Sequence, residues 1–331
     1  MRNTGAGMAI TGSGSAKPDS FLTNEDLSAL VETSDEWIKT RTGISQRHLA
    51  NPQMGLSQLA AAAALEALTM AGLTPESVDL IILATSTPDD LFGSACQVQT
   101  LLGASRAVAF DLTAACSGFV FALVTAAQYI RTGVYENVLV IGADVLSRWV
   151  DWSDRNTCVL FGDGAGAVVC QAQAVDNLLG FEICSDGTQN SSLNLAYQGQ
   201  TKTLKENVAI TQGIYQPLTM NGKEVYRFAV AKVPSVIEKA LHRANLNASD
   251  LDWLLLHQAN QRIMDAVAER LGIDSQKVIS NLVKYGNTSA ASIPIALDEA
   301  VRSGQVQTGN IIATSGFGAG LTWGAVIFKW G

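Results

Sequence analysis

The chain has 331 residues, a formal net charge of −8, 47% hydrophobic residues and 16% charged residues. These values fit a soluble α/β protein with room for two core-bearing halves, and they argue against broad affinity for nucleic acid or a membrane surface. No apolar run is long enough to span a bilayer, and the first residues lack a secretory signal pattern. Five cysteines without metal-binding spacing indicate reduced thiols, so we expect a cytoplasmic protein.

Continuous apolar runs predict strands that are buried on both faces of a sheet. In chain order they cover 80–84, 138–141, 165–170, 254–256 and 325–328. An Ala-rich pattern over 118–131 predicts a long helix. The segment from about 185 to 223 is polar and irregular, and we expect an insertion or surface loops there. The elements together predict stacked layers of helices and sheets.

A repeat relates the two halves of the chain. Segments 67–83 and 240–256 align without a gap at an offset of 173 residues, and six of their 17 positions are identical. Each copy has the pattern of a helix, a turn and a buried strand. A match between 130–133 and 301–304 has an offset of 171. We therefore predict duplicated α/β halves that pack around a pseudo-twofold axis.

One cysteine, Cys116, lies where an apolar run meets the start of the predicted helix over 118–131. Backbone N–H groups are unpaired at such a position, and the helix dipole favours a thiolate there. Cys116 is therefore a candidate nucleophile. A small buried hydrophobe that covers a core helix is the alternative. The other four cysteines lie in apolar segments and are expected in the core: Cys96, Cys158, Cys170 and Cys184.

The repeat predicts where two further polar residues lie. At an offset of 171, Cys116 aligns with Asn287, which would start the equivalent helix, and at 173 His257 follows the equivalent strand. Ligands of α/β sheets bind outside the carboxyl ends of strands, so we expect all three side chains to converge. His257 and Asn287 would then donate hydrogen bonds to a carbonyl or enolate oxygen. A core histidine and an ordinary helix N-cap are the alternatives.

The Gly-rich segment 315–324 predicts a hairpin whose backbone approaches a ligand closely. Backbone N–H groups of Cys116 and Ala319 could form an oxyanion hole. A plain tight turn is the alternative.

These segments resemble the β-ketoacyl-acyl carrier protein synthase III family of the thiolase-like superfamily. The resemblance rests on motifs at 33–38, 41–44, 111–119, 161–166, 221–225, 257–263, 286–292 and 318–324. It implies two thiolase-like halves that form a five-layer αβαβα sandwich. The implied halves are 1–180, which carries the cysteine, and 181–331, which carries the histidine and the asparagine. Two positions depart from the family pattern, Tyr285 and Ala319.

The resemblance also implies an activity, the first condensation of fatty-acid biosynthesis. Cys116 would take an acyl group, expected to be acetyl, from acyl-CoA as a thioester. His257 and Asn287 would bind the thioester oxygen of malonyl-acyl carrier protein while it loses CO₂. The resulting carbanion would attack the acyl-cysteine and give 3-oxoacyl-carrier protein. No metal or tightly bound organic cofactor is implied.

Further residues receive roles from the resemblance alone. Trp37 and Arg155 would hold the CoA adenine between them, and Arg41 would lie near the CoA phosphates. The implied acyl pocket involves Phe92, Leu160 and Phe161, and Phe92 would reach into the partner subunit of a homodimer. Contacts with the acidic carrier protein are implied for Gln258, Arg262 and Arg227. For the arginines, a solvated surface charge is the alternative.

Three other functions remain open at this point. The first is a related Cys-His-Asn condensing enzyme or CoA-dependent acyltransferase of secondary metabolism, with a different acceptor. The second is a papain-like hydrolase, which also uses Cys, His and Asn but would lack the repeat. The third is an acyl-CoA-binding protein without catalysis.

Overall fold

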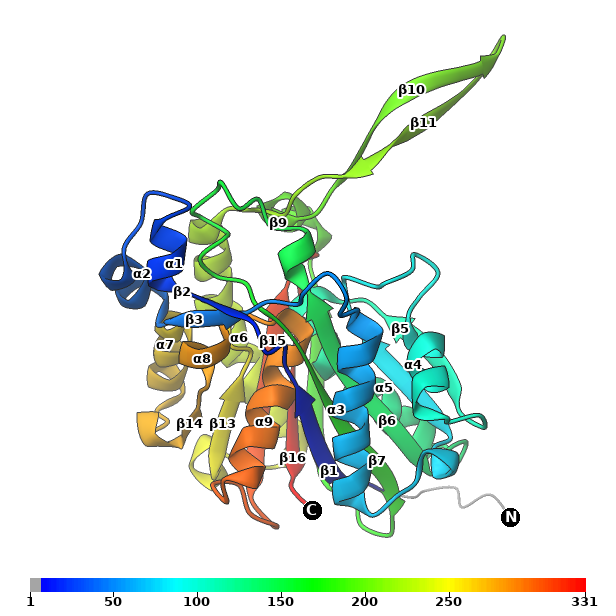
Figure 1. The fold of residues 1–331 in the computed structure, drawn as a ribbon. Helices are drawn as coiled ribbons and strands as arrows, with labels where there is room; N and C mark the ends of the chain where they lie inside the picture. The colour runs from blue at the N-terminus through cyan, green and yellow to red at the C-terminus, as the bar shows by residue number, and fades with distance from the viewer. Residues whose placement is uncertain (1–6) are drawn as a thin grey trace.

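The computed structural model describes residues 7–331, which form two five-stranded sheets with helices packed on them (Figure 1). The first sheet has the order β1-β7-β6-β4-β5 and the second β8-β16-β15-β13-β14. The first contains β1 (Gly7–Ala16), β4 (Leu80–Ala84), β5 (Val108–Leu112), β6 (Asn137–Val145) and β7 (Asp163–Gln173). The second contains β8 (Leu178–Ser185), β13 (Trp253–Leu256), β14 (Val278–Ile279), β15 (Ile311–Gly318) and β16 (Thr322–Lys329). In both orders the first two pairs are antiparallel and the last two parallel, which confirms the duplication.

The helices complete five layers. α3 (Leu56–Ala71) and α4 (Ala95–Leu102) cover the outer face of the first sheet, and α6 (Gly222–Ala244) and α7 (Gln261–Leu271) cover that of the second. α5 (Gly118–Arg131) and α9 (Ser292–Arg302) lie between the sheets and contact both. Alternate residues of each buried strand enter different cores, as the continuous apolar runs require. The predicted αβαβα sandwich is therefore confirmed.

The identical positions of the repeat have identical structural roles. A Cβ atom on Gly12 of β1 would lie 2.3 Å from the carbonyl oxygen of Ala67 on α3. A Cβ atom on Gly180 of β8 would lie 2.4 Å from the carbonyl oxygen of Ala240 on α6. Each half thus uses a glycine and a small helical residue to bring a helix onto its first strand. This close approach explains why both copies of the repeat have alanine at this position, Ala67 and Ala240.

The carboxylates of the repeat are equivalent as well. Asp79 accepts the backbone N–H of Asn137, 3.0 Å away, where β6 begins. Asp252 accepts the backbone N–H of Ile311, 2.7 Å away, where β15 begins. Both aspartates fix the start of a central strand whose other end leads toward the middle of the molecule.

The segment predicted as irregular contains regular structure. A hairpin of β10 (Tyr197–Lys205) and β11 (Val208–Tyr215) projects from the body (Figure 1). The short strands β9 (Leu193–Asn194) and β12 (Thr219–Met220) pair at its base. Every residue of β10 and β11 is exposed, so no buried face imposed an apolar alternation on the sequence. The segment is therefore an insertion, one of the two expectations, and it contains a hairpin that the sequence did not predict.

The remaining short elements lie near the carboxyl ends of the second sheet's parallel strands. They are α1 (Asn24–Ser28), α2 (Asp35–Thr42), α8 (Leu282–Tyr285), β2 (Phe21–Thr23) and β3 (Gln46–His48). Within residues 7–331, no helix combines the length and apolar character needed to cross a membrane.

Two of the four cysteines predicted in the core are not buried. Cys158 and Cys170 are buried as expected, whereas Cys96 is exposed and Cys184 is partly exposed. Cys96 lies on the solvent side of the short helix α4, and Cys184 lies near the end of the edge strand β8. Apolar neighbours in sequence did not distinguish these peripheral positions from the core.

The chain passes from the first sheet to the second between β7 and β8, close to the predicted boundary at residue 180. Because α5 and α9 contact both sheets, the two halves share one central layer. The division into halves 1–180 and 181–331 therefore stays a prediction. The two halves do not have separate cores, because they share the central helices.

The shared layer yields a stability prediction at Gly142 on β6. A Cβ atom there would lie 2.2 Å from the carbonyl oxygen of Ala290, so Gly142→Ala forces the two halves apart. We expect a loss of about 3 kcal/mol in the free energy of unfolding, measured by urea denaturation. Gly187→Ala, at a position with open space around it, is the control and should change stability by less than about 0.5 kcal/mol. Equal stability of the two variants would contradict the tight crossing.

Candidate active site

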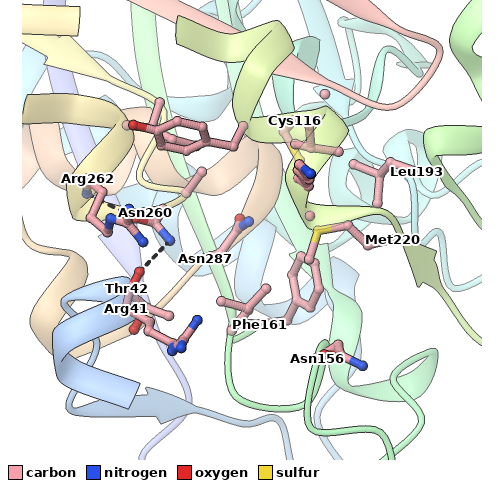
Figure 2. A pocket seen from close by; sticks show the side chains of 18 of the residues that line it. Arg41, Thr42, Cys116, Asn156, Phe161, Leu193, Met220, Asn260, Arg262 and Asn287 are labelled. Carbon is pink, nitrogen blue, oxygen red and sulfur yellow. Dashed lines mark hydrogen bonds between the residues drawn. The ribbon is translucent and has the colours of Figure 1, made fainter. Parts of the chain in front are cut away.

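The predicted convergence of Cys116, His257 and Asn287 is present in the structure. All three line one cavity of about 510 Å³, whose walls also include residues of α2 and of the N-terminal ends of α6 and α7. Figure 2 shows Cys116 and Asn287 among the residues that line it. The cavity is also lined by the three residues that the resemblance implies for CoA: Trp37, Arg41 and Arg155. Residues from both halves and from the N-terminal helices thus meet in one depression.

Cys116 lies in a single helical turn, η2 (Ala115–Ser117), that leads into α5. Its side chain is 8% exposed, and its sulfur lies 3.2 Å from the Ser289 hydroxyl oxygen. Burial raises the pKa of the thiol to about 12, although the hydrogen bond from Ser289 acts in the opposite direction. The expectation that the helix dipole favours a thiolate therefore stays a prediction, and burial of the sulfur opposes it.

His257 directly follows β13, and its position is fixed from three sides. Its backbone N–H donates to the carbonyl oxygen of Ser315 (2.8 Å), and its ring packs edge-on against Phe317 (5.3 Å between centroids). Its Nδ1 lies 2.7 Å from the Ser292 hydroxyl oxygen. That hydroxyl oxygen also accepts the backbone N–H of Gln258 (3.3 Å), so its own proton is available for Nδ1. This arrangement favours the tautomer that carries its hydrogen on Nε2.

Burial lowers the pKa of His257 to about 3. The ring is therefore neutral at physiological pH, and it can donate a hydrogen bond without carrying a charge. A neutral donor suits a site from which water is largely excluded, because no charge has to be desolvated there.

Asn287 is held by its backbone and by one side-chain oxygen. Its N–H donates to the carbonyl oxygen of Leu160 (2.9 Å), and its carbonyl oxygen accepts the N–H of Gly162 (3.0 Å). Its Oδ1 accepts the backbone N–H of Ser289 (2.9 Å). Because Oδ1 is engaged in this way, Nδ2 is the side-chain group left to donate into the cavity. Asn287 is not the N-cap of α9, which is Ala291.

The structural alignment of the two halves corrects one step of the sequence argument. The turn η2 corresponds to η7 (Ser289–Ala291), since both directly precede a central helix. Ala115 and Ser289, the first residues of these turns, have φ values of 47° and 51°. Cys116 is therefore equivalent to Ala290 and not to Asn287. The last residues of α5 and α9 are 171 positions apart in sequence. Because α9 is three residues shorter than α5, the first residues of the two helices are 174 positions apart.

The Gly-rich hairpin between β15 and β16 lies directly against the cysteine. A Cβ atom on Gly318 would lie 2.7 Å from the backbone nitrogen of Cys116, and one on Gly316 would lie 3.1 Å from its carbonyl oxygen. Glycine is required for this approach. The predicted hairpin is thus confirmed, and Ala319 follows Gly318 at its tip. The oxyanion hole of Cys116 and Ala319 N–H groups stays a prediction.

At the mouth of the cavity, two guanidinium groups flank one indole. The Cζ atoms of Arg41 and Arg155 lie 4.9 and 5.4 Å from the ring centroid of Trp37. Arg155 also donates to the carbonyl oxygen of Glu32 (3.0 Å). Trp37 and Arg155, the pair implied to hold an adenine, therefore lie beside each other at the mouth.

One residue that ties this mouth together was quoted only as part of a motif. Asn260 is the N-cap of α7, where its Oδ1 accepts the N–H of Arg262 (2.9 Å). Its Nδ2 donates to the carbonyl oxygen of Arg41 (3.0 Å), which links α7 to α2 (Figure 2). An asparagine just before an amphipathic helix is a recognisable cap signal, but its second contact has no signal in sequence.

The residues implied for carrier-protein contact do not share one environment. Arg262 is exposed and lies over the ring of Tyr226 (5.7 Å), and Arg227 is exposed and paired with Glu224 (2.9 Å). Gln258, in contrast, is buried, and its amide bonds the carbonyl oxygens of Leu256 and Ile279. A direct contact between Gln258 and a partner protein is therefore corrected: the side chain holds the strand ends behind His257.

A second cavity of about 530 Å³ meets the first at the cysteine, and its lining is mainly apolar. Cys116 and Phe161 line both cavities, whereas Leu160 lines only the first, which differs from the expected acyl pocket. Phe92 lines neither, and it is 99% exposed. The walls that sequence reasoning missed include Leu146, Trp149, Leu195, Tyr215 and Leu218.

The departure at Tyr285 now has a structural explanation. Its hydroxyl donates to Glu299 (2.6 Å), and its ring packs against His48 (5.3 Å). Burial and the neighbouring Glu299 carboxylate raise its pKa. Tyr285 thus supports the backbone that leads into Asn287 from behind and does not line either of the two cavities.

The duplicated five-layer fold, with Cys, His and Asn at the meeting point of its halves, defines a thiolase-like protein and excludes a papain-like one. Two family models match the chain, "3-Oxoacyl-[acyl-carrier-protein (ACP)] synthase III" over residues 110–187 and its C-terminal counterpart over 241–330. A beta-ketoacyl-[acyl-carrier-protein] synthase III from Microcystis aeruginosa is 71% identical over 332 residues, which covers 100% of both chains. The chain belongs to the β-ketoacyl-acyl carrier protein synthase III family.

Solved structures agree with this assignment. The 3-oxoacyl-[acyl-carrier-protein] synthase III from Aquifex aeolicus matches with a TM-score of 0.88 and 44% identity, over 98% of this chain and 100% of that one. The priming β-ketosynthase of the R1128 polyketide pathway matches with a TM-score of 0.91 and 35% identity, over 100% and 98%. The fold is thus common to fatty-acid and polyketide enzymes, while the higher sequence identities are with the former.

The lowered pKa of His257 gives a prediction about acid stability. Above pH 6.5 the ring is neutral in both states, but between pH 6.5 and about 3 the unfolded chain binds a proton that the folded chain does not. Stability contributed by the neutral ring is therefore lost as pH falls, by up to about 1.4 kcal/mol per pH unit. His257→Gln should remove this part of the slope in urea unfolding between pH 6.5 and 4.5. The same exchange at exposed His242 is the control, and identical slopes for all three proteins would contradict a neutral, buried His257.

Proposed function

We propose that this chain catalyses the initiating condensation of fatty-acid biosynthesis, from an acyl-CoA primer and malonyl-acyl carrier protein to 3-oxoacyl-carrier protein, CoA and CO₂. One observation carries the proposal: Cys116 lines both cavities, one with a Trp and Arg mouth and one with apolar walls. A nucleophile at this junction can take an acyl chain into the apolar cavity while the carrier leaves through the other.

In the first half-reaction, the Cys116 sulfur attacks the thioester carbonyl of acyl-CoA. The negative charge that develops on the carbonyl oxygen is stabilised by backbone N–H groups of Cys116 and Ala319. The tight contact between Gly318 and the Cys116 backbone supports this role, because it fixes both N–H groups before the substrate arrives. CoA then leaves, and the acyl group remains on the sulfur as a thioester.

In the second half-reaction, malonyl-carrier protein occupies the cavity that CoA has left. Nε2–H of His257 and Nδ2–H of Asn287 donate to its thioester oxygen, which becomes an enolate oxygen as CO₂ departs. The hydrogen bonds that hold Nδ1 and Oδ1 support the assignment of both groups as donors. The carbanion attacks the acyl-cysteine, and the cysteine sulfur is released.

Binding of the two carriers is proposed at the cavity mouth. The adenine of CoA would stack between Trp37 and Arg155, with Arg41 near the phosphates. Arg262 and Arg227 would attract the acidic carrier protein to the same rim, which an acidic chain needs in order to overcome net repulsion.

A homodimer is part of the proposal. Phe92 and its neighbour Leu91 are strongly exposed, and β5 is an unpaired edge strand beside them, so this surface has the character of a subunit contact. Phe92 would then close the acyl pocket of the partner subunit.

Free thiols at all five cysteines support a reducing, cytoplasmic setting.

The acyl-enzyme tests the proposal directly. After incubation with acetyl-CoA, intact-mass spectrometry should show a gain of one acetyl group, and Cys116→Ala should show none because it lacks the sulfur. Cys158→Ala is the control, since that thiol is buried away from both cavities. If no primer from a panel of short and branched acyl-CoAs adds mass, the proposed function is wrong.

The division of labour gives a second prediction. His257→Ala and Asn287→Ala should each acetylate at close to the normal rate, because neither donor serves the first half-reaction. Condensation with malonyl-carrier protein should fall by about 10²–10³-fold in each, the usual cost of one such donor. Single-turnover assays of the two half-reactions separate these outcomes, and equal losses in both would refute the assignment.

A further inference from the structure

The insertion between the two halves has no role in the proposed mechanism, although its base reaches the apolar cavity. That cavity of about 530 Å³ meets the first one at Cys116, and β9 and the end of β11 contribute to its lining. The insertion supplies five lining residues: Leu193, Asn194, Leu195, Tyr215 and Leu218. The exposed hairpin of β10 and β11 is thus continuous, at its base, with a wall of the space that the acyl chain would occupy.

A third cavity, of about 820 Å³, adjoins this wall. It is lined by residues of the segment 85–93, of α4 and of the edge strand β5, and by Tyr215. The apolar cavity and the third cavity share four lining residues: Ser86, Pro88, Leu91 and Tyr215. Leu91 and Tyr215 have the largest side chains of the four. These two side chains therefore form most of the partition between the cavities.

The ring of Tyr215 is held by two other aromatic rings. It packs edge-on against Trp149 (6.2 Å between centroids) and against Tyr197, its pairing partner across the hairpin (5.5 Å). The Tyr197 hydroxyl accepts the backbone N–H of Gly213 (2.7 Å), which fixes that ring in turn. Edge-to-face contacts between aromatic rings are favourable, so Tyr215 has a defined place at the end of β11.

The backbone on both sides of this ring is tied to the rest of the structure. The N–H of Gln216 donates to the carbonyl oxygen of Ala196 (2.9 Å), and the N–H of Leu218 donates to that of Trp149 (2.8 Å). Trp149 also lines the apolar cavity. The base of the hairpin is therefore joined to the turn that follows β6, and the position of Tyr215 does not depend on the projecting part of the hairpin.

The other side of the partition is anchored by Asp89, two residues before Leu91. Its carboxylate accepts the backbone N–H groups of Leu56 (3.0 Å) and Ser57 (2.8 Å), where α3 begins. It also pairs with Arg148 (2.8 Å), which directly precedes Trp149 in the chain. Both sides of the partition are thus connected to the same turn after β6.

We propose that Tyr215 and Leu91 set the upper length of the acyl primer by closing the apolar cavity toward the third cavity. The apolar lining favours a hydrocarbon chain. A chain that exceeds the space between the Cys116 sulfur and the partition meets the tyrosine ring, whereas a shorter straight or branched chain fits. The inference rests on the proposed function, because it assigns a limit to the acyl group that Cys116 accepts. Tyr215 and Leu91 are therefore specificity-determining residues.

A panel of straight-chain thioesters, from acetyl-CoA to dodecanoyl-CoA, tests this limit through single-turnover acylation read by intact mass. The rate for the wild type should fall sharply beyond one chain length. Tyr215→Ala joins the two cavities, so its limit should move to longer chains. For the first chain that the wild type rejects, its rate relative to acetyl-CoA should rise at least about tenfold. Leu91→Ala opens the partition from the other side and should shift the limit in the same direction.

Two further variants show whether the tyrosine ring itself is responsible. Tyr215→Phe keeps the ring and should keep the wild-type limit. Ile214→Ala is the matched control, because neighbouring residues of a strand point to opposite faces. Ile214 is 69% exposed and lines neither the apolar nor the third cavity. Its exchange should leave the rates for the whole panel unchanged.

The same panel separates failure of the length limit from failure of the proposed function. If no acyl-CoA adds mass to the wild type, the proposed function fails and the limit fails with it. If the wild type accepts short chains but Tyr215→Ala has the same limit as Ile214→Ala, or is acylated by no chain, only the length limit is refuted. Equal rates of the wild type with every chain in the panel would refute it as well, since no wall would then end the cavity.

Discussion

The close packing of two helix starts at the centre of the molecule is the constraint on which the rest depends. The turns η2 and η7 approach each other because glycines and alanines line the crossing, as at Gly142 and Gly118, which both lie against Ala290. Larger side chains would separate the halves. This one contact brings Cys116 of the first half against Ser289 of the second. The shared layer is therefore both the core of the fold and the floor of the site.

Burial at this floor determines the chemistry of the site. Burial raises the pKa of the Cys116 thiol and lowers that of His257, because the surroundings offer little water to either charge. Hydrogen bonds, and not contacts between charged groups, therefore hold the two side chains in place. The partners Ser289 and Ser292 come from the same short stretch of chain before and at the start of α9, so a few residues set both proton arrangements.

Sequence reasoning found the fold because its strongest signals are local and repeated. The apolar runs predicted the strands, and the offset of 173 residues predicted the duplication. The duplication also predicted that Cys116, His257 and Asn287 lie together, although the residue equivalent to Cys116 is three positions after Asn287. The hairpin of β10 and β11 could not be found from apolar alternation, because both its faces are solvent-exposed. Ser289 was missed for a different reason: it is unremarkable in its own segment, and only the fold places it against Cys116.

The contact of Arg155 with Trp37 has a consequence for the proposed adenine site. An aromatic base between them needs van der Waals contact of about 3.5 Å on each face, about 7 Å in all, whereas the guanidinium lies 5.4 Å from the ring centroid. Under the proposed function, an adenine between the two groups would therefore have to displace Arg155 from this position, and part of its binding free energy would be spent on that displacement.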